Sequence, residues 1–412
     1  MYSSFSNVIK LRIILLFISV FFNAMVMPYI VVYFVERVGI NLASMMVFGV
    51  GLAGILGGLL GGRYGDKYGR KRLILIGEIG SGTGFLIACS TSFFNEFLSF
   101  IIFVSFLFIY FFSGLSNPAY SALIIDETTT ENRKAVYVIL LWVSNMAFAL
   151  GSILGGFFFY KFSALLFFLV GCSSFLSCFC IAFWVKDRYT RSKQVSLHNN
   201  PSTNEPLSVN KLDVYKQILK SPAFISIVTL SMLLSLMNNQ LSYYLSVYYV
   251  NLFDSTGYTL LGFLRSENTL MTVLLTFFIT NILKKVYEFK TLSIGICLFF
   301  VGYIALSIGQ NHSILYIAMA VMTVGQIIYS PVIQTVTAEV IPYDHRSTYL
   351  SILDVVGHIG GICAFLFVPL MNYVQPINIT VIYVLFGVIS LTIIYRLKHI
   401  RSKVNTAISS VS

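Results

Sequence analysis

The sequence predicts an all-α membrane protein with twelve transmembrane helices in two pseudo-symmetric six-helix bundles. Three observations support this prediction. The chain of 412 residues is 57% hydrophobic and only 10% charged. Its apolar runs are long enough to cross a bilayer. Its two halves carry similar residues at the same spacing. A membrane-spanning helix needs about 20 apolar residues. Backbone groups in lipid must be hydrogen-bonded internally, so long continuous runs favour helices.

Six apolar runs precede a polar segment at 186–222, and six follow it. That segment contains Pro201 and Pro206 and has no apolar periodicity, which is typical of a linker. We therefore expect an N-terminal bundle at 1–185, a cytoplasmic linker at 186–222 and a C-terminal bundle at 223–412. The expected spans are 11–35, 40–62, 73–92, 97–124, 136–160, 163–185, 223–250, 259–283, 291–309, 313–338, 348–371 and 376–395.

The distribution of basic residues predicts the orientation. With the N-terminus in the cytoplasm, 24 of the 27 lysines and arginines fall on inner segments. Cytoplasmic loops of membrane proteins carry such an excess, so both termini are expected on the cytoplasmic side of the cell membrane. The net charge of +11 is accounted for by these loops. It therefore indicates a lipid bilayer rather than nucleic acid as the partner.

The two halves resemble each other at an offset of 213 residues. Each half has a proline in its fourth span, followed by two acids and an arginine at the same spacing. An internal repeat of two six-helix units is typical of transporters whose substrate site lies between the halves near the bilayer midplane. The matched pairs are Pro118 and Pro331, Asp126 and Glu339, Glu131 and Asp344, and Arg133 and Arg346.

The loop at 62–72, between the second and third spans, carries the strongest motif. It is similar to the signature loop of the major facilitator superfamily, Gly-x-Leu-x-Asp-Arg-x-Gly-Arg-Lys. The resemblance implies the two-bundle major facilitator fold. The loop matches at Gly62, Asp66, Gly69, Arg70 and Lys71, and departs at Tyr64 in place of leucine and at Lys67 in place of arginine.

This loop has chemistry suited to a gate at the inner face. Glycine permits a tight turn, Asp66 can accept hydrogen bonds from a neighbouring helix N-terminus, and Arg70 can pair with Asp126. In the superfamily such a charged cluster latches the inner gate, and the resemblance implies the same here, with Arg133 in the cluster. The alternative is a purely cationic anchor, which leaves Asp66 and the glycines without a role.

Segments 117–134 and 329–335 resemble the twelve-helix drug:proton antiporters, of the lactococcal multidrug type. This likeness implies export of small amphipathic compounds, driven by a proton gradient and effected by alternating access. Segment 151–156 resembles the antiporter motif Gly-Pro-x-x-Gly-Gly, with Ser152 where proline is expected. It fits an antiporter-specific kink and a generic interface of small residues equally well.

The sequence departs from the multidrug relatives inside the membrane. Where those proteins place acids, the nearest positions here hold Leu140, Asn239 and Gln326. Neutral polar groups at that depth line a cavity or hydrogen-bond between helices, and Tyr244 fits a vestibule or an aromatic belt. They favour a second possibility, transport of one neutral or zwitterionic solute such as a peptide or sugar. The candidates for the cavity are Asn23, Asn145, Asn238, Asn239, Gln240, Tyr244 and Gln326.

Three groups are candidates for proton coupling. Asp354 and His358 are four residues apart on one face of the eleventh span, and a carboxylate beside an imidazole fits a proton relay. Glu78 lies one to two turns inside the third span. Asp354 and His358 also fit a structural pair, or a contact of Asp354 with the gate loop. Arg265 and Glu267, expected near the outer end of the eighth span, can contact substrate or each other.

Other classes of protein lack support in the sequence. No Gly-x-x-x-x-Gly-Lys-Ser/Thr loop for ATP is present, and no nucleophile or metal constellation indicates an enzyme or a cofactor. The six cysteines lie in apolar runs without ligand spacing. We expect a monomer whose partners are a small-molecule substrate, protons and lipid. A non-transporting membrane sensor with the same fold is the alternative from another class.

Overall fold

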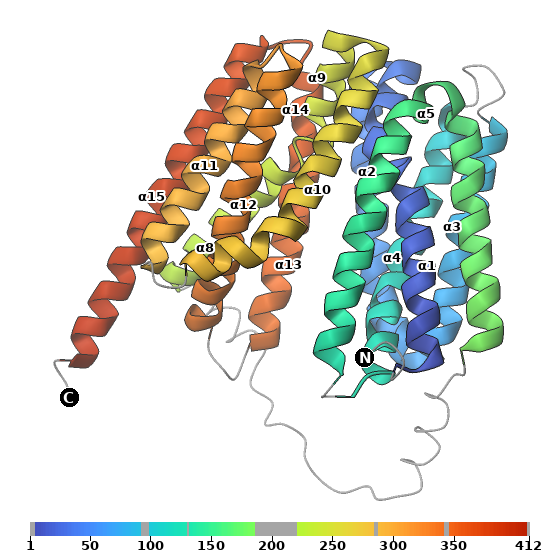
Figure 1. The fold of residues 1–412 in the computed structure, drawn as a ribbon, viewed down its shortest axis with the longest axis horizontal. Coiled ribbons are helices and arrows are strands. Elements are labelled where there is room, and N and C mark those ends of the chain that lie inside the picture. The colour runs from blue at the N-terminus through green and yellow to red at the C-terminus, as the bar shows by residue number, and fades with distance from the viewer. Residues whose placement is uncertain are drawn as a thin grey trace, which may run out of the picture. The chain divides into compact units, whose positions relative to one another are not determined.

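The computed structural model describes residues 5–91, 99–129, 132–185, 221–283, 287–341 and 346–409, and these residues form helices without a strand. The predicted all-helical class is therefore confirmed (Figure 1). The helices are α1 (Asn7–Ala24), η2 (Met27–Tyr29), α2 (Ile30–Tyr68), α3 (Arg70–Thr91), α4 (Ser99–Asp126), α5 (Arg133–Trp184), α8 (Pro222–Asn238), α9 (Tyr244–Phe253), α10 (Ser255–Leu283), α11 (Glu288–Ile308), α12 (His312–Val340), α13 (Arg346–Cys363), η5 (Ala364–Leu366), α14 (Phe367–Leu370) and α15 (Pro376–Ser409).

Within the described residues, eight helical stretches are long and apolar enough to cross a membrane. Two of them, Asn7–Gly65 and Ala135–Trp184, have 59 and 50 residues, about twice or more the length of one crossing. Each is interrupted where the sequence separates two expected spans, α2 at Gly39 and α5 at Phe162. In Figure 1 the chain of α5 runs up and then down. The multi-pass helical architecture is confirmed, and the count of twelve stays a prediction.

The chain divides into two compact units. One comprises Met1–Thr203 with Ser246–Thr269, and the other comprises Asn204–Leu245 with Leu270–Ser412. The segment Ser246–Thr269 therefore packs with the N-terminal helices, although it follows the linker in sequence. The expected linker lies almost wholly outside the described residues. It ends where Ser221 caps α8 by accepting a hydrogen bond from the Phe224 amide. The domain boundaries stay a prediction.

In the first unit, glycines allow α2 to pack directly on the backbone of α4. A Cβ atom at Gly57 would lie 2.0 Å from the Phe111 carbonyl oxygen, and one at Gly61 would lie 2.3 Å from that of Leu115. Small residues permit such close approach in membranes, where apolar burial alone does not hold helices together. α4 also packs against α3, and α5 packs against α1 and α3. These contacts place the start of α3 beside the end of α4.

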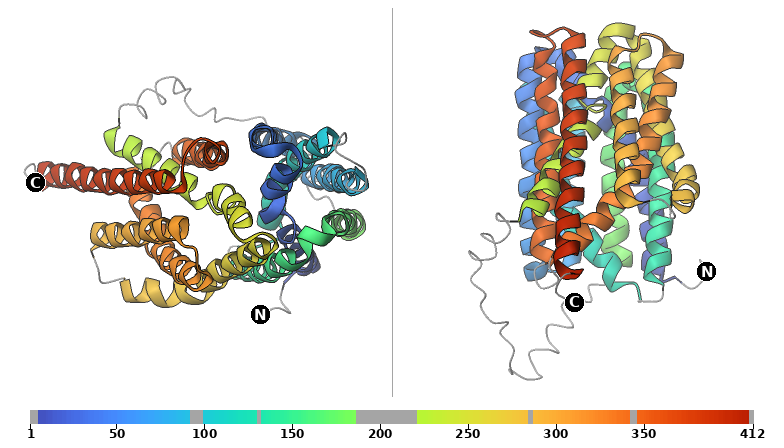
Figure 2. Two further views of the ribbon diagram at one scale, coloured as in Figure 1. Left: turned by 90° about the horizontal axis from the view of Figure 1, so that it is seen from above. Right: turned by 90° about the vertical axis from the view of Figure 1, so that its left-hand side faces the viewer.

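In the second unit, α11 packs against both α12 and α15, and α8 packs against α13. The courses of α11 and α15, which pack against each other, can be followed in Figure 2. Gly325 of α12 faces the backbone of α11, because a Cβ there would lie 2.3 Å from the Phe299 amide nitrogen. The prolines of the predicted repeat, Pro118 and Pro331, lie inside α4 and α12, helices of 28 and 29 residues.

Candidate functional site

The predicted gate begins at a turn of a single residue. α2 ends at Tyr68 and α3 begins at Arg70, and Gly69 between them has φ 92° and ψ 146°. Glycine adopts this left-handed backbone readily, whereas a residue with a Cβ does so only with strain. The turn therefore places Arg70 at the first position of α3. Asp66 belongs to the last turn of α2, but its side chain lies outside what the structure describes.

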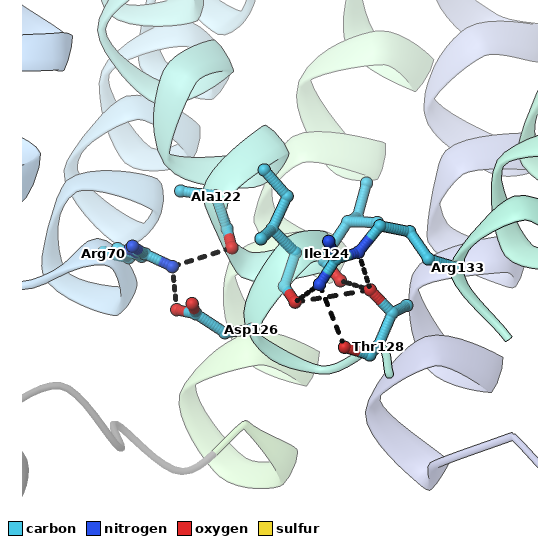
Figure 3. Close-up of polar contacts among 7 residues, drawn as sticks. Arg70, Ala122, Ile124, Asp126, Thr128 and Arg133 are labelled. Atoms are coloured by element: carbon cyan, nitrogen blue, oxygen red, sulfur yellow. Dashed lines mark hydrogen bonds and ion pairs between the residues drawn. The ribbon is translucent and has the colours of Figure 1, made fainter. Parts of the chain in front are cut away.

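Arg70 joins the start of α3 to the end of α4 (Figure 3). Its Nη1 atom forms an ion pair with Asp126 and donates a hydrogen bond of 2.7 Å to the Ala122 carbonyl oxygen. The side chains of Arg70 and Asp126 are 21% and 41% exposed. An ion pair with this much exposure contributes about 0–1 kcal/mol. The expected ion pair of Arg70 with Asp126 is therefore present, and breaking it costs little free energy.

Arg133 and Lys71 cap helix ends in the same region. The Arg133 guanidinium donates to Thr128 Oγ1 at 3.1 Å and to the Ile125 carbonyl oxygen at 3.3 Å, so it holds the chain just after α4 (Figure 3). Lys71 Nζ donates to the Ala182 carbonyl oxygen at 2.7 Å, near the end of α5. Cations interact favourably with the last carbonyls of a helix. The gate role of these residues and of Gly62 stays a prediction.

The second unit pairs the repeat counterpart of Asp126 differently. Glu339, near the end of α12, lies 2.7 Å from Arg401, which also lies 2.9 Å from Glu288. The cation therefore comes from α15, the last helix, rather than from a helix that follows a tight turn. The other residues of the repeat, Glu131 and Asp344, and the side chain of Arg346 lie outside the described part of the chain.

A second polar contact between α3 and α4 lies deeper in the first unit. Tyr120 of α4 donates a hydrogen bond of 2.5 Å to Glu78 Oε1 of α3. The Arg12 guanidinium of α1 stacks on the Tyr120 ring, with 3.8 Å between Cζ and the ring centroid. Glu78 was predicted from sequence, but its two partners were not. The expected pair of Arg70 with Asp126 could have indicated Tyr120, because in two antiparallel helices this pair brings residue 78 close to the level of residue 120.

Asp354 and His358 lie together on α13 as the spacing requires. His358 Nδ1 is 3.8 Å from Asp354 Oδ1 and 2.8 Å from the Asp354 carbonyl oxygen. A ring nitrogen that approaches a carbonyl oxygen at 2.8 Å carries the proton and donates it. Their side chains are 76% and 60% exposed. The contact is therefore local to one helix turn, and the relay role stays a prediction.

The polar residues of the second unit form hydrogen bonds between helices. Gln240, which is fully buried, accepts a hydrogen bond of 3.1 Å from Tyr383 of α15 and donates one of 3.4 Å to the Ala364 carbonyl oxygen. Asn238 donates to Tyr329 of α12 at 3.0 Å. Tyr244 is buried as well. These contacts satisfy groups that are costly to bury without a partner, and lining of a cavity stays a prediction.

Three asparagine side chains bond back to their own helices. Asn23, Asn145 and Asn239 each donate to the carbonyl oxygen four residues earlier, at 2.9, 2.7 and 2.9 Å. This arrangement occupies a donor and leaves the side-chain oxygen available. Gln326 of α12 is half-buried. All four residues stay candidates for contact with substrate.

The small-residue segment of α5 makes close helix contacts. Cβ atoms at Gly151 and Gly155 would lie 2.2 Å from the Phe21 carbonyl oxygen and 2.6 Å from that of Met25. A Cβ at Gly262 of α10 would lie 2.5 Å from the Ser152 carbonyl oxygen, which also accepts a hydrogen bond of 2.6 Å from Tyr29. Of the two expected roles, the interface of small residues is therefore observed. The non-helical residue of α5 is Phe162, beyond the motif.

Arg265 and Glu267 lie near the middle of α10. Because α10 begins at Ser255, Glu267 lies about 18 Å along the helix, and its expected place near the outer face stays a prediction. The Oε2 atom of Glu267 and the Oγ atom of Ser266 are buried, and neither has a hydrogen-bond partner in the part of the chain that the structure describes. The helix begins four residues before the expected span 259–283, because residues 255–258 are helical although this segment is largely polar.

Glycine at residue 69 provides a test of the turn. Gly69→Ala is expected to destabilise the protein by about 1–3 kcal/mol, because alanine is strained at this φ. The apparent Tm of the detergent-purified protein should fall by several degrees. Gly62→Ala is the matched control, since Gly62 is exposed and no atom lies within 4 Å of its added Cβ. Equal Tm values for the two variants would contradict the role given to the turn.

Comparisons with known proteins agree with this architecture. The sequence profile described as Major Facilitator Superfamily matches residues 13–364 and 259–408. A Na(+), Li(+), K(+)/H(+) antiporter of Planococcus maritimus is 24% identical over 364 residues, covering 84% of this chain and 85% of that protein. A crystal structure of the peptide transporter POT with sulfate has a TM-score of 0.70 at 17% identity, over 95% of this chain and 94% of that one.

A POT family transporter in complex with 5-aminolevulinic acid has a TM-score of 0.69 at 15% identity, with 96% of both chains covered. At these identities the solved structures show the fold alone. The family profile spans most of the chain, and the helical architecture agrees with it. The protein is therefore a transporter of the Major Facilitator Superfamily.

Proposed function

We propose that this protein is a proton-driven secondary transporter that exports small amphipathic compounds by alternating access. The contact of Arg70 with Asp126 and Ala122 at the inner ends of α3 and α4 carries this proposal. Alternating access needs a barrier that forms and breaks once per cycle. A half-exposed ionic contact suits that purpose because its net free energy is small.

Protons are the coupling ion in this proposal. The relative from Planococcus maritimus is named an antiporter of cations against protons, and the sequence contains no phosphate-binding loop for ATP. Glu78, Asp354 and His358 are protonatable groups on the helices α3 and α13. Ionisable residues within membrane segments commonly serve ion or proton pathways.

Two other cargoes have an observation in their favour. The name of the same relative favours exchange of monovalent metal cations for protons. The neutral hydrogen-bonding residues Asn238, Asn239 and Gln240 favour a neutral or zwitterionic solute such as a peptide. A sensor would bind solute without moving it. These cases differ in what crosses the membrane, so one transport experiment separates them.

The test uses the purified protein in proteoliposomes with an imposed pH gradient. We expect the gradient to drive accumulation of ethidium, a lipophilic cation, and to have little effect on Na⁺ or on a neutral dipeptide. Gradient-driven movement of Na⁺ or of the dipeptide alone would replace the proposed cargo. Binding of ethidium without counterflow would indicate a sensor, and the absence of any movement driven by the gradient would refute proton coupling.

A further inference from the structure

Two side-chain contacts join α3 to α4, and each of them connects residues at a similar level of the two helices. Arg70 pairs with Asp126 at the inner ends of the helices, and Glu78 pairs with Tyr120 further in. Eight residues separate the two members on α3 and six on α4, or about 12 and 9 Å of helix. We propose that Glu78, with Tyr120 and Arg12, is a proton-binding site that controls the contact of Arg70 with Asp126 and Ala122. This contact is called the latch below. This inference rests on the proposed proton-driven transport.

Glu78 occupies a constructed polar site rather than a chance gap. Glu78 is 9% exposed, and its carboxylate accepts a hydrogen bond of 2.5 Å from Tyr120. Residues of three helices meet there, since Arg12 comes from α1, Glu78 from α3 and Tyr120 from α4. A buried carboxylate is costly unless it is hydrogen-bonded and near a cation. This site supplies both, so the carboxylate can exist there with or without a proton.

Arg12 provides the balancing charge. Its guanidinium lies on the Tyr120 ring, an arrangement in which the ring face attracts the cation. The Arg12 Nε atom is buried and has no hydrogen-bond partner among the described residues. Its interaction with Glu78 is a long-range charge attraction. The ionised carboxylate is therefore stabilised without a fixed Arg–Glu fork, and a proton can compete for it.

Three titratable groups of the described residues interact electrostatically with Glu78. They are Arg12 of α1, Tyr120 of α4 and the Cys178 thiol of α5. When a hydronium ion transfers its proton to a Glu78 carboxylate oxygen, an O–H bond of hydronium breaks and a carboxyl O–H bond forms. Water is released and the negative charge of Glu78 is lost. Tyr120 then loses its charged acceptor, and the hydrogen bond between α3 and α4 weakens, because bonds to charged groups are the stronger ones.

The change reaches the latch through α4. Tyr120 precedes Ala122, whose carbonyl oxygen accepts from Arg70, and Asp126, which pairs with Arg70. A shift of α4 relative to α3 at Tyr120 therefore alters both contacts of Arg70. Proton binding at Glu78 releases the latch, and proton loss restores it. The contact of Asp354 with His358, by comparison, lies within one turn of α13.

The decisive measurement detects the proton itself. Infrared difference spectra of the full-length protein in liposomes, recorded between acid and alkaline pH, should contain the carbonyl band of a protonated carboxylic acid. We expect Glu78→Gln to remove this band. Glu127→Gln, which changes a partly exposed acid at the end of α4, should retain it. Retention of the full band in Glu78→Gln would overturn the proposal, as would its loss in Asp354→Asn alone.

Tyr120→Phe tests the site even if Glu78→Gln does not fold. Phenylalanine keeps the ring beneath Arg12 but removes the hydroxyl that stabilises the ionised carboxylate. The proton is then held more tightly, so the midpoint of the band should move to higher pH by about 1–2 units. Tyr110→Phe of the same helix is the control, because the Tyr110 hydroxyl contacts the Met27 sulfur. An unchanged midpoint in Tyr120→Phe would contradict the assignment.

Transport separates failure of this inference from failure of the proposed function. In proteoliposomes, ethidium accumulation driven by the pH gradient should fall at least 10-fold in Glu78→Gln, while exchange of ethidium without a gradient stays within about 2-fold of wild type. Gradient-driven accumulation by Glu78→Gln at the wild-type rate would refute the site alone. A wild-type protein that shows the Glu78 band but moves no ethidium would refute the proposed cargo and leave the proton site supported.

Discussion

Gly57→Ala is expected to prevent formation of a stable protein, whereas Gly58→Ala is expected to be tolerated. The Cβ at residue 57 would lie 2.0 Å from the Phe111 carbonyl oxygen, whereas the nearest atom to a Cβ at residue 58 is the Gly114 carbonyl oxygen at 3.9 Å. To relieve the clash, α2 and α4 would have to separate, at an expected cost above about 3 kcal/mol.

Size-exclusion chromatography of the detergent-extracted protein checks this result. Gly57→Ala should lose most of the monodisperse peak, while Gly58→Ala should keep it and the wild-type Tm. The two glycines are neighbours in one helix, so the change in helix propensity and the position along the helix are matched. A normal peak for Gly57→Ala would mean that the close approach of α2 and α4 is not needed for folding.

Breaking the latch is expected to have the second large effect. Asp126→Asn removes the charge that pairs with Arg70 and leaves the Ala122 carbonyl oxygen as its acceptor. We expect folded protein whose gradient-driven ethidium transport falls at least 10-fold, because one state of the transport cycle loses its stabilising contact. Arg70→Gln should have a similar effect. Uptake assays in proteoliposomes, normalised to the amount of folded protein, measure both.

Exchange of the two charges distinguishes a latch from an anchor. The double variant Arg70→Asp with Asp126→Arg restores an ion pair but moves the cation away from the start of α3. We expect it to recover at least a third of the activity lost by Asp126→Asn. Recovery is not expected if Arg70 serves only to hold the loop in the cytoplasm, because the exchange removes that cation from the loop. Full activity of Asp126→Asn would refute the latch.

Much of the fold could be predicted because lipid imposes a simple rule on sequence. Continuous apolar runs must be helical, and the breaks at Gly39 and Phe162 fall where the expected spans change. The apolar pattern does not mark the end of a helix whose first turn is polar. The first turn of α10 is polar, so this helix begins at Ser255, four residues before the expected span 259–283.

The candidate site was predictable to the extent that it depends on local spacing. The Gly69 turn and the pair of Arg70 with Asp126 follow from the loop motif, and the contact of Asp354 with His358 follows from helix periodicity. Tertiary partners do not follow from spacing. Arg12 is one cation among several in the sequence, and only the packing of α1 beside α4 places it on Tyr120.

The second unit has a consequence for how the protein is produced. Arg401 is eleven residues from the end of the sequence, and it is shared by two glutamates on different helices, Glu288 and Glu339. A polypeptide shortened to residue 400 keeps every apolar span yet leaves two anions near one another without their common counterion. A protein truncated there to carry an affinity tag would therefore have a destabilised second unit, whereas the same tag fused after Ser412 leaves Arg401 in place.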